Sequence, residues 1–159
     1  MAYGKKYITS WYSQIQEHYF RAEIWQDGYS GEVIEVEASD NAASISWETS
    51  DNNLLNPIKS LQADIAFLSS ESFSLSSFYS NTDQSFRLDI YCDTLHTGEY
   101  ANKLLFTGFI IQDESGEEWS DIVHYIQLKA TDNIGLLKDI TLDKCTFSSG
   151  TGTKKRSLT

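Results

Sequence analysis

"YFRAEIWQDG" (Tyr19–Gly28) alternates between two kinds of side chain along an extended chain. Phe20, Ala22 and Ile24 fall on one face, and Arg21, Glu23 and Trp25 fall on the other. Such period-two alternation is typical of a half-buried strand, and the Asp27-Gly28 pair that follows is a turn signal. The stretch therefore predicts a β-strand with one face in a core.

The same alternation recurs along most of the chain. A short β-prone run covers 7–11, and the runs at 19–28, 31–39 and 43–48 follow one another closely enough to predict an antiparallel meander. After a turn-rich connection at 50–60, which contains Pro57, three further alternating runs appear. The residues expected to face inward after the first strands are Ile34, Val36, Ala38, Ala43, Ile45, Trp47, Leu61, Ala63, Ile65, Phe67, Phe86, Leu88, Ile90, Cys92, Ile126, Leu128 and Ala130.

Two other stretches predict special features of the sheet. "KLLFTGFIIQD" (103–113) is apolar on both faces, which favours a central or doubly covered strand, and Gly108 within it marks a bulge or a close approach. "DESGEE" (113–118) is expected to be a polar hairpin loop, and "SESFSLSSFYS" (70–80) a short helix or irregular crossing.

The last strand is expected to end at Thr131-Asp132. Asp132 or Asn133 can cap a following helical turn, and Gly135 permits tight backbone packing. The apolar residues Ile134, Leu136, Leu137 and Ile140 are then expected to plug the end of a barrel.

These patterns together predict a mainly β protein. The expected fold is an antiparallel barrel or sandwich of about seven or eight strands with one or two short helices. Residues 1–147 are expected to form this domain, and 148–159, which are small, polar and glycine-bearing, to form a flexible segment.

Composition excludes several functional classes. The net charge is −11, and the only basic cluster is Lys154-Lys155-Arg156, so specific nucleic-acid recognition is disfavoured. No apolar run approaches the length needed to span a bilayer. Cys92 falls on the inward face of a strand, which predicts a small buried hydrophobe, whereas the pattern leaves the role of Cys145 open.

Catalytic and metal-binding patterns are also missing. There is no GxSxG elbow, and His18, His96 and His124 are far apart in the sequence. No Walker or dinucleotide glycine pattern occurs, and neither "SDNN" (50–53) nor the 113–118 stretch has EF-hand spacing. We therefore assign no catalytic, cofactor-binding or metal-binding residue and expect a protein that is not an enzyme.

Four aromatic residues are the better candidates for binding. Tyr19, Trp25, Tyr91 and Tyr125 fall on the outward phase of their strands. Outward aromatic rings can stack on sugars, can be buried against a neighbouring subunit or second layer, or can pack under loops of the same domain. All three interpretations stay open at this point.

The order of the motifs resembles a known family. "AEIWQDGYSGEVIEVEAS" (22–39), "NNLLNPIKSLQADIAFLS" (52–69), "FRLDIY" (86–91), "LLFTGFIIQDE" (104–114) and "IQLKATDNIGLLKDI" (126–140) follow one another. This set, which spans about residues 7–140, is similar to the N-terminal region of large tail proteins of phages and prophages of Bacteroidetes-type hosts. "GTKKRSLT" (152–159) is similar to the start of a helical segment in longer members, so the sequence is expected to be a piece of a longer protein.

The resemblance implies a structural role. It implies a tail-tip or baseplate-hub protein of the virion tail, made in the host bacterial cytoplasm, with a tail-tube-like β-barrel. The implied partners are further copies of the chain, as a trimeric ring around the tail channel, and other tail proteins. DNA is expected to pass through the lumen without specific recognition. The alternative prediction is a carbohydrate-binding β-sandwich module, which the outward aromatics would also suit.

Overall fold

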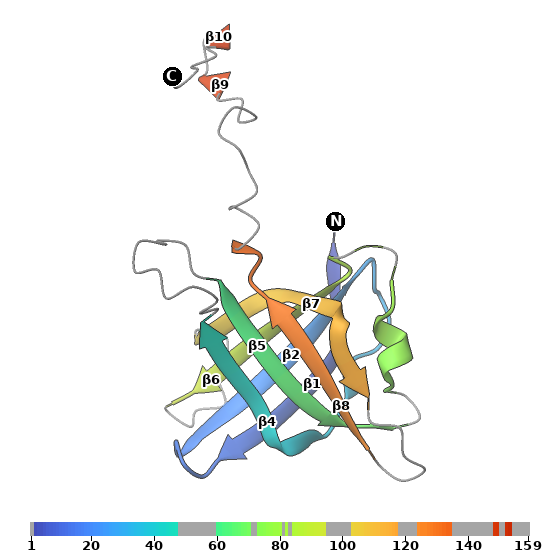
Figure 1. The fold of residues 1–159 in the computed structure, drawn as a ribbon, viewed down its shortest axis with the longest axis vertical. Coiled ribbons are helices and arrows are strands. Elements are labelled where there is room, and N and C mark those ends of the chain that lie inside the picture. The colour runs from blue at the N-terminus through green and yellow to red at the C-terminus, as the bar shows by residue number, and fades with distance from the viewer. Residues whose placement is uncertain are drawn as a thin grey trace.

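Antiparallel strands make up almost all of the regular structure. The computed structural model describes residues 2–47, 60–70, 73–80, 82, 84–94, 103–117, 124–134, 148–149 and 152–153. The predicted mainly β fold is confirmed (Figure 1). The elements are β1 (Tyr3–Ser13), β2 (His18–Asp27), β3 (Ile34–Glu35), β4 (Ala38–Trp47), β5 (Leu61–Leu68), the 3-10 helix η1 (Leu75–Phe78), β6 (Phe86–Asp93), β7 (Leu104–Glu117), β8 (Tyr125–Thr131), β9 (Ser148–Ser149) and β10 (Gly152–Thr153).

Eight of these strands form one sheet in the order β3-β1-β2-β6-β7-β8-β5-β4. All neighbours are antiparallel except β1 and β3, which are parallel. The predicted meander of 19–28, 31–39 and 43–48 is wrong, because β2 lies between β1 and β6 and contacts neither β3 nor β4 in the sheet. β1 is longer than the predicted run at 7–11, and it pairs with the edge of β2 on which the meander would have placed the run at 31–39.

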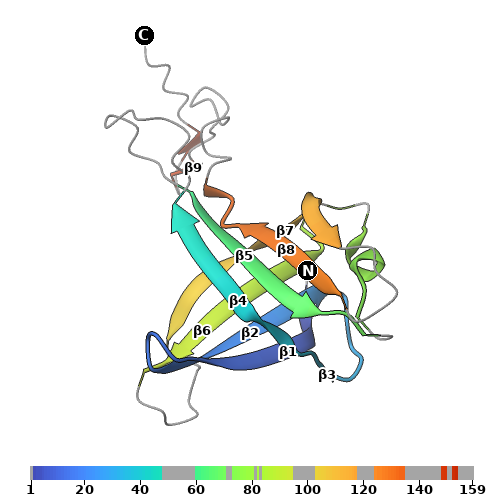
Figure 2. The same ribbon diagram turned by 60° about the horizontal axis from the view of Figure 1, so that its bottom comes forward.

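The sheet curls until its two ends come together through one short stretch of chain. β3 pairs with Tyr7 and Ile8 of β1, and the Val36 N–H donates to the Ile8 carbonyl at 2.9 Å. Immediately afterwards the Leu68 N–H donates to the Glu37 carbonyl at 2.9 Å. Residues 34–38 therefore link β1 to β5, which lies near the other end of the sheet, and the sheet has a barrel-like shape (Figure 2).

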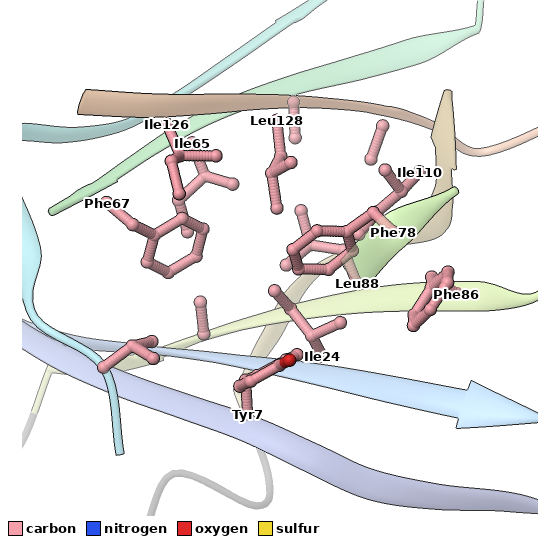
Figure 3. Close-up of a cluster of buried hydrophobic side chains, with 14 of the residues drawn as sticks. Tyr7, Ile24, Ile65, Phe67, Phe78, Phe86, Leu88, Ile110, Ile126 and Leu128 are labelled. Atoms are coloured by element: carbon pink, nitrogen blue, oxygen red, sulfur yellow. The ribbon is translucent and has the colours of Figure 1, made fainter. Parts of the chain in front are cut away.

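The inner face of the curled sheet holds the core. The inward residues predicted on β2, β5, β6 and β8 are buried, including Cys92, except Leu61 of β5, which is partly buried. Figure 3 shows Ile65 and Leu128 on one wall of the core and Ile24 on the opposite wall, with Phe78 of η1 between the walls. The ring of Phe73, just before η1, lies 4.9 Å from Tyr7 and 5.0 Å from Phe67. The predicted short helix at 70–80 is therefore confirmed, and it closes part of the core.

Three predictions about the walls of the sheet are wrong. Ile45 and Trp47 were expected to be buried, but they are 40% and 62% exposed because β4 is the last strand of the sheet and has no neighbour on its outer side. The stretch Asp113–Glu117 belongs to β7 and is not a loop, since the strand continues past an irregularity between Ile111 and Gly116. The central position of β7, between β6 and β8, is confirmed.

Asp132 forms the predicted corner after β8. Its Oδ1 accepts from the Ile134 N–H and its Oδ2 from the Leu61 N–H, both at 3.0 Å. The Asp132 N–H in turn donates to the Leu61 carbonyl at 3.1 Å. The expected role of Ile134 as a plug is wrong, because its side chain is exposed. Leu136, Leu137 and Ile140 lie outside the described residues.

The C-terminal region has one described element. β9 and β10 form a small antiparallel pair, with Ser149 opposite Gly152 and Ser148 opposite Thr153. The other residues from 135 onward, Cys145 among them, lie outside the described residues, so the boundary at 147 and the flexibility of 148–159 stay predictions.

Gly108 is required by a close approach between β7 and β8, as the sequence predicted. A Cβ atom on Gly108 would lie 2.4 Å from the Thr131 carbonyl oxygen and 2.6 Å from Cζ of Phe106, whose ring lies over the glycine. We expect Gly108→Val to lower the free energy of unfolding by about 2 kcal/mol or more, because backbone and ring must both move. Chemical denaturation measures this change.

Gly116 provides the matched control on the same strand. A Cβ atom there would meet nothing within 4 Å, so Gly116→Val should leave the free energy of unfolding nearly unchanged. Equal losses for the two variants would show that strand propensity, and not the contact with Thr131, explains the requirement for glycine.

Candidate functional site

The outer face of β1, β2, β6 and β7 gathers most of the candidate residues. Along β2 the inward residues alternate with Tyr19, Arg21, Glu23 and Trp25, and Arg21 lies opposite Tyr91 of β6. Three of the four predicted aromatics, Tyr19, Trp25 and Tyr91, therefore share one face. Tyr125 does not join them, because it lies at the start of β8, on the far side of β7.

Two buried carboxylates lie side by side at the centre of this face. Glu23 and Asp89 are directly opposite each other on β2 and β6, and they are only 2% and 4% exposed. Like charges in such a pair repel each other unless cations compensate them. Glu23 Oε1 lies 2.8 Å from Lys5 Nζ and 3.0 Å from Arg21 Nε.

Asp89 is compensated from the other side. Its Oδ2 lies 2.9 Å from Arg87 Nη2, and its Oδ1 accepts a hydrogen bond of 2.6 Å from the Thr107 hydroxyl of β7. The carboxylate pair is thus enclosed by three cations and a hydroxyl group from four adjacent strands. This arrangement joins the strands across the outer face in the same way that apolar packing joins them inside.

The same cations cover the aromatic rings. Lys5 Nζ and the Arg87 guanidinium each lie 5.1 Å from the centre of the Trp25 ring, and Arg21 lies 5.3 Å from that of Tyr91. These are cation–π distances. Burial, followed by the charges of Asp89 and Glu23, raises the pKa of the Tyr91 phenol, while Arg21 and Arg87 act in the opposite direction. Trp25 and Tyr91 are therefore largely engaged within their own chain.

One end of the face is different. The rings of Tyr12 and Tyr19 lie 4.8 Å apart next to the β1–β2 turn and are 45% and 43% exposed. Ile15 in the turn is 97% exposed, and Leu104, opposite Tyr91 in the register, is about half exposed. We call Tyr12, Ile15 and Tyr19 the hairpin surface. Each of these side chains is exposed in the part of the chain that the structure describes.

Sequence reasoning found only Tyr19 of this surface. Tyr12 was missed because the first strand was expected to end at Trp11, whereas β1 continues to Ser13. Extending the period-two pattern from Tyr7 would have placed Tyr12 on the outer face beside Tyr19. Ile15 carries no periodic signal, because it lies in a turn.

A groove adjoins the hairpin surface where the curled sheet stays open. Beyond residues 34–38, β1 and β4 separate and leave a cavity of about 650 Å³. The described part of its lining includes Trp11, Tyr12, Ala38, Ala42 and Ala43 and contains no charged side chain. The outer edge of β4 borders it, so unpaired strand and apolar side chains occur together here.

No group of three or more His, Cys, Asp or Glu side chains in the described ranges is placed to hold a metal ion. His124, which precedes β8 and is not within it, lies 2.7 Å from Glu117 Oε1, and Oε2 of the same carboxylate accepts from the Leu75 N–H of η1. This carboxylate therefore ties η1 to the end of β7. None of the helices among the described residues is long and apolar enough to cross a membrane.

Arg87 pairs with a buried carboxylate and Lys129 with an exposed one, so their removal should lower the free energy of unfolding by different amounts. Arg87→Ala should lower the free energy of unfolding by about 2 kcal/mol or more, because it leaves Asp89 buried without its cation and uncovers Trp25. Lys129→Ala, which removes an exposed ion pair with Glu114 at 3.3 Å, should cost less than about 1 kcal/mol. Urea denaturation of both variants checks this, and equal costs would contradict the enclosed carboxylate pair.

Comparison of the chain with protein-family models, with curated proteins and with solved structures found no match. The similarity to phage tail proteins therefore rests on the order of the sequence motifs. The function proposed next depends on that order and on the geometry of the outer face.

Proposed function

We propose that this chain is a structural subunit of a phage tail tip or baseplate hub, and that it assembles with copies of itself into a ring, expected to be trimeric, around the tail channel. The proposal assigns no catalytic role to the chain. The observation that carries it is the hairpin surface, where the neighbouring rings of Tyr12 and Tyr19 and the side chain of Ile15 are exposed at the β1–β2 turn. The motif order described above and the barrel-like sheet support it.

Burial by a partner is the simplest physical role for the hairpin surface. Aromatic residues are enriched in the centres of protein interfaces, and contiguous exposed apolar areas mark interaction sites. Tyr12 and Tyr19 lie on adjacent strands of a hairpin, so their positions are fixed by the sheet before a partner arrives. Little conformational entropy is then lost when they are covered.

The edge of β4 supports assembly through a second kind of contact. It is the last strand of the sheet, and Ser44 to Trp47 along it contain no charged residue that would discourage pairing with another strand. Such an edge can extend a sheet across a subunit boundary. A ring requires two different surfaces on each subunit, and closed rotational symmetry prevents open polymerisation.

The charge of the chain is compatible with a channel for DNA. A net charge of −11 suppresses phosphate binding, so DNA would slide past such subunits without being held. Other tail proteins are the expected further partners. The site of action would be the virion tail.

The test compares the pair Tyr12 and Tyr19 with Tyr125, and all three side chains have similar exposure. In the full-length protein, the double variant Tyr12→Ser/Tyr19→Ser should weaken self-association by about 100-fold or more, because two aromatic anchors are lost. Sedimentation velocity over a concentration series measures this. Tyr125→Ser is the matched control, since Tyr125 is 49% exposed but lies apart on β8.

Co-purification of the full-length protein with other tail components tests the wider assignment. An unchanged association constant in the double variant would remove the hairpin surface from the interface. A full-length protein that stays monomeric and joins no tail complex would overturn the proposed function itself.

A further inference from the structure

A second groove lies at the opposite end of β2 from the hairpin surface. It is formed by the connection before β6, the middle of β7 and the end of β8, and its volume is about 490 Å³. Small-molecule sites span roughly 300–1,000 Å³. Asp27 at the end of β2 is hydrogen-bonded to Ser85, beside this groove, whereas Tyr19 is at the start of the same strand.

The lining combines residues that carry amide groups with apolar residues. Gln84, Gln112 and Asn133 carry amides, Asp113 a carboxylate and Ser80 a hydroxyl group, and the apolar residues are Phe109, Ile110 and Ile111. The Gln112 Oε1 accepts from the Ser80 N–H at 3.0 Å, so its NH₂ group is the end that can donate to a ligand. The groove therefore offers donors and acceptors next to apolar side chains.

The groove walls are held in place by neighbouring contacts. The Tyr3 hydroxyl donates to the Gln84 carbonyl at 2.6 Å, and the Tyr3 ring lies 6.3 Å from that of Phe109. Phe109 itself is paired in the sheet with Arg87 on one side and Thr131 on the other. Both the aromatic ring and the opposite wall are thus positioned by the fold.

This chemistry disfavours two other classes of ligand. The described residues that line the groove include Asp113 and no Lys, Arg or His, so a phosphate or carboxylate ligand would be repelled by the Asp113 carboxylate. One carboxylate among these residues is a poor set of ligands for Ca²⁺, which takes six to eight oxygens.

We propose that this groove binds a neutral, polyhydroxylated ligand, that is, an uncharged glycan. Sugar hydroxyl groups both donate and accept, which matches an array of amides, a carboxylate and a hydroxyl group. The apolar face of a sugar ring can lie against Phe109. This site goes beyond the assembly role and uses none of the residues of the hairpin surface.

The test uses the full-length protein and three neutral probes: cellotetraose, maltotetraose and the tetramer of N-acetylglucosamine. At least one should shift the ¹H–¹⁵N signals of Gln112, Asp113 and Asn133 saturably at millimolar concentration. Asp113→Ala should weaken that binding by about tenfold, because the carboxylate accepts a charge-assisted hydrogen bond. Glu114→Ala is the matched control and should bind like the unmodified chain, since Glu114 is outside the lining.

Three outcomes would overturn the glycan site. The first is the absence of any saturable shift with all three probes, and the second is shifts confined to Tyr12 and Tyr19. The third is an affinity of the Asp113→Ala variant for the probe equal to that of the unmodified chain. Glucose 6-phosphate binding as tightly as the neutral probes would also contradict the exclusion of anions. The Tyr12→Ser/Tyr19→Ser variant should keep its glycan affinity, so failure of this inference is distinguishable from failure of the assembly role.

Discussion

A single sheet with apolar side chains on one face can bury that face only by curling on itself, and here the curl depends on residues 34–38. Within this short stretch the backbone is bonded first to Ile8 of β1 and then to Leu68 of β5. These two contacts hold the walls that carry Ile24 and Ile65 face to face across one core. Residues 34–38 therefore hold the sheet curled, so that the apolar faces of its strands enclose one core.

A curled sheet leaves its outer face without a second layer, and this chain covers much of that face with its own long side chains. Lys5, Arg21 and Arg87 lie over aromatic rings while they neutralise Glu23 and Asp89. Buried ion pairs stabilise little when compared with apolar packing, but breaking one is costly. These cations do not extend to the β1–β2 turn, where the side chains of Tyr12, Ile15 and Tyr19 are exposed.

Strand phase was predictable because it depends only on neighbours in the sequence. Phe20, Ala22 and Ile24, like the inward residues of β6 and β8 and all those of β5 except Leu61, are buried as the alternation predicts. Strand order was not predictable in the same way. The meander was wrong because the partner of β2 is β6, which is far away in the sequence, and no local pattern records that choice.

The candidate site shows the same limit. Outward phase identified Tyr19, Trp25 and Tyr91, but whether a ring is covered depends on cations from other strands, and only the fold brings Arg87 to Trp25. Ile45 and Trp47 have the inward phase of a core strand and are exposed because their strand is the last one. The groove near Phe109 is lined by Gln84, Gln112 and Asn133 from three separate segments, so no single sequence motif could have predicted it.

The central claim is that the hairpin surface is buried between copies of this chain in the assembled particle. Site-specific photocrosslinking tests it most directly, with Tyr19 replaced by a benzoylphenylalanine residue in the full-length protein and the products identified by mass spectrometry. The account predicts a covalent adduct between position 19 and a second copy of the chain, and much less adduct from the same replacement at Tyr125. An intact assembly in which position 19 yields no adduct with any copy of the chain would contradict it.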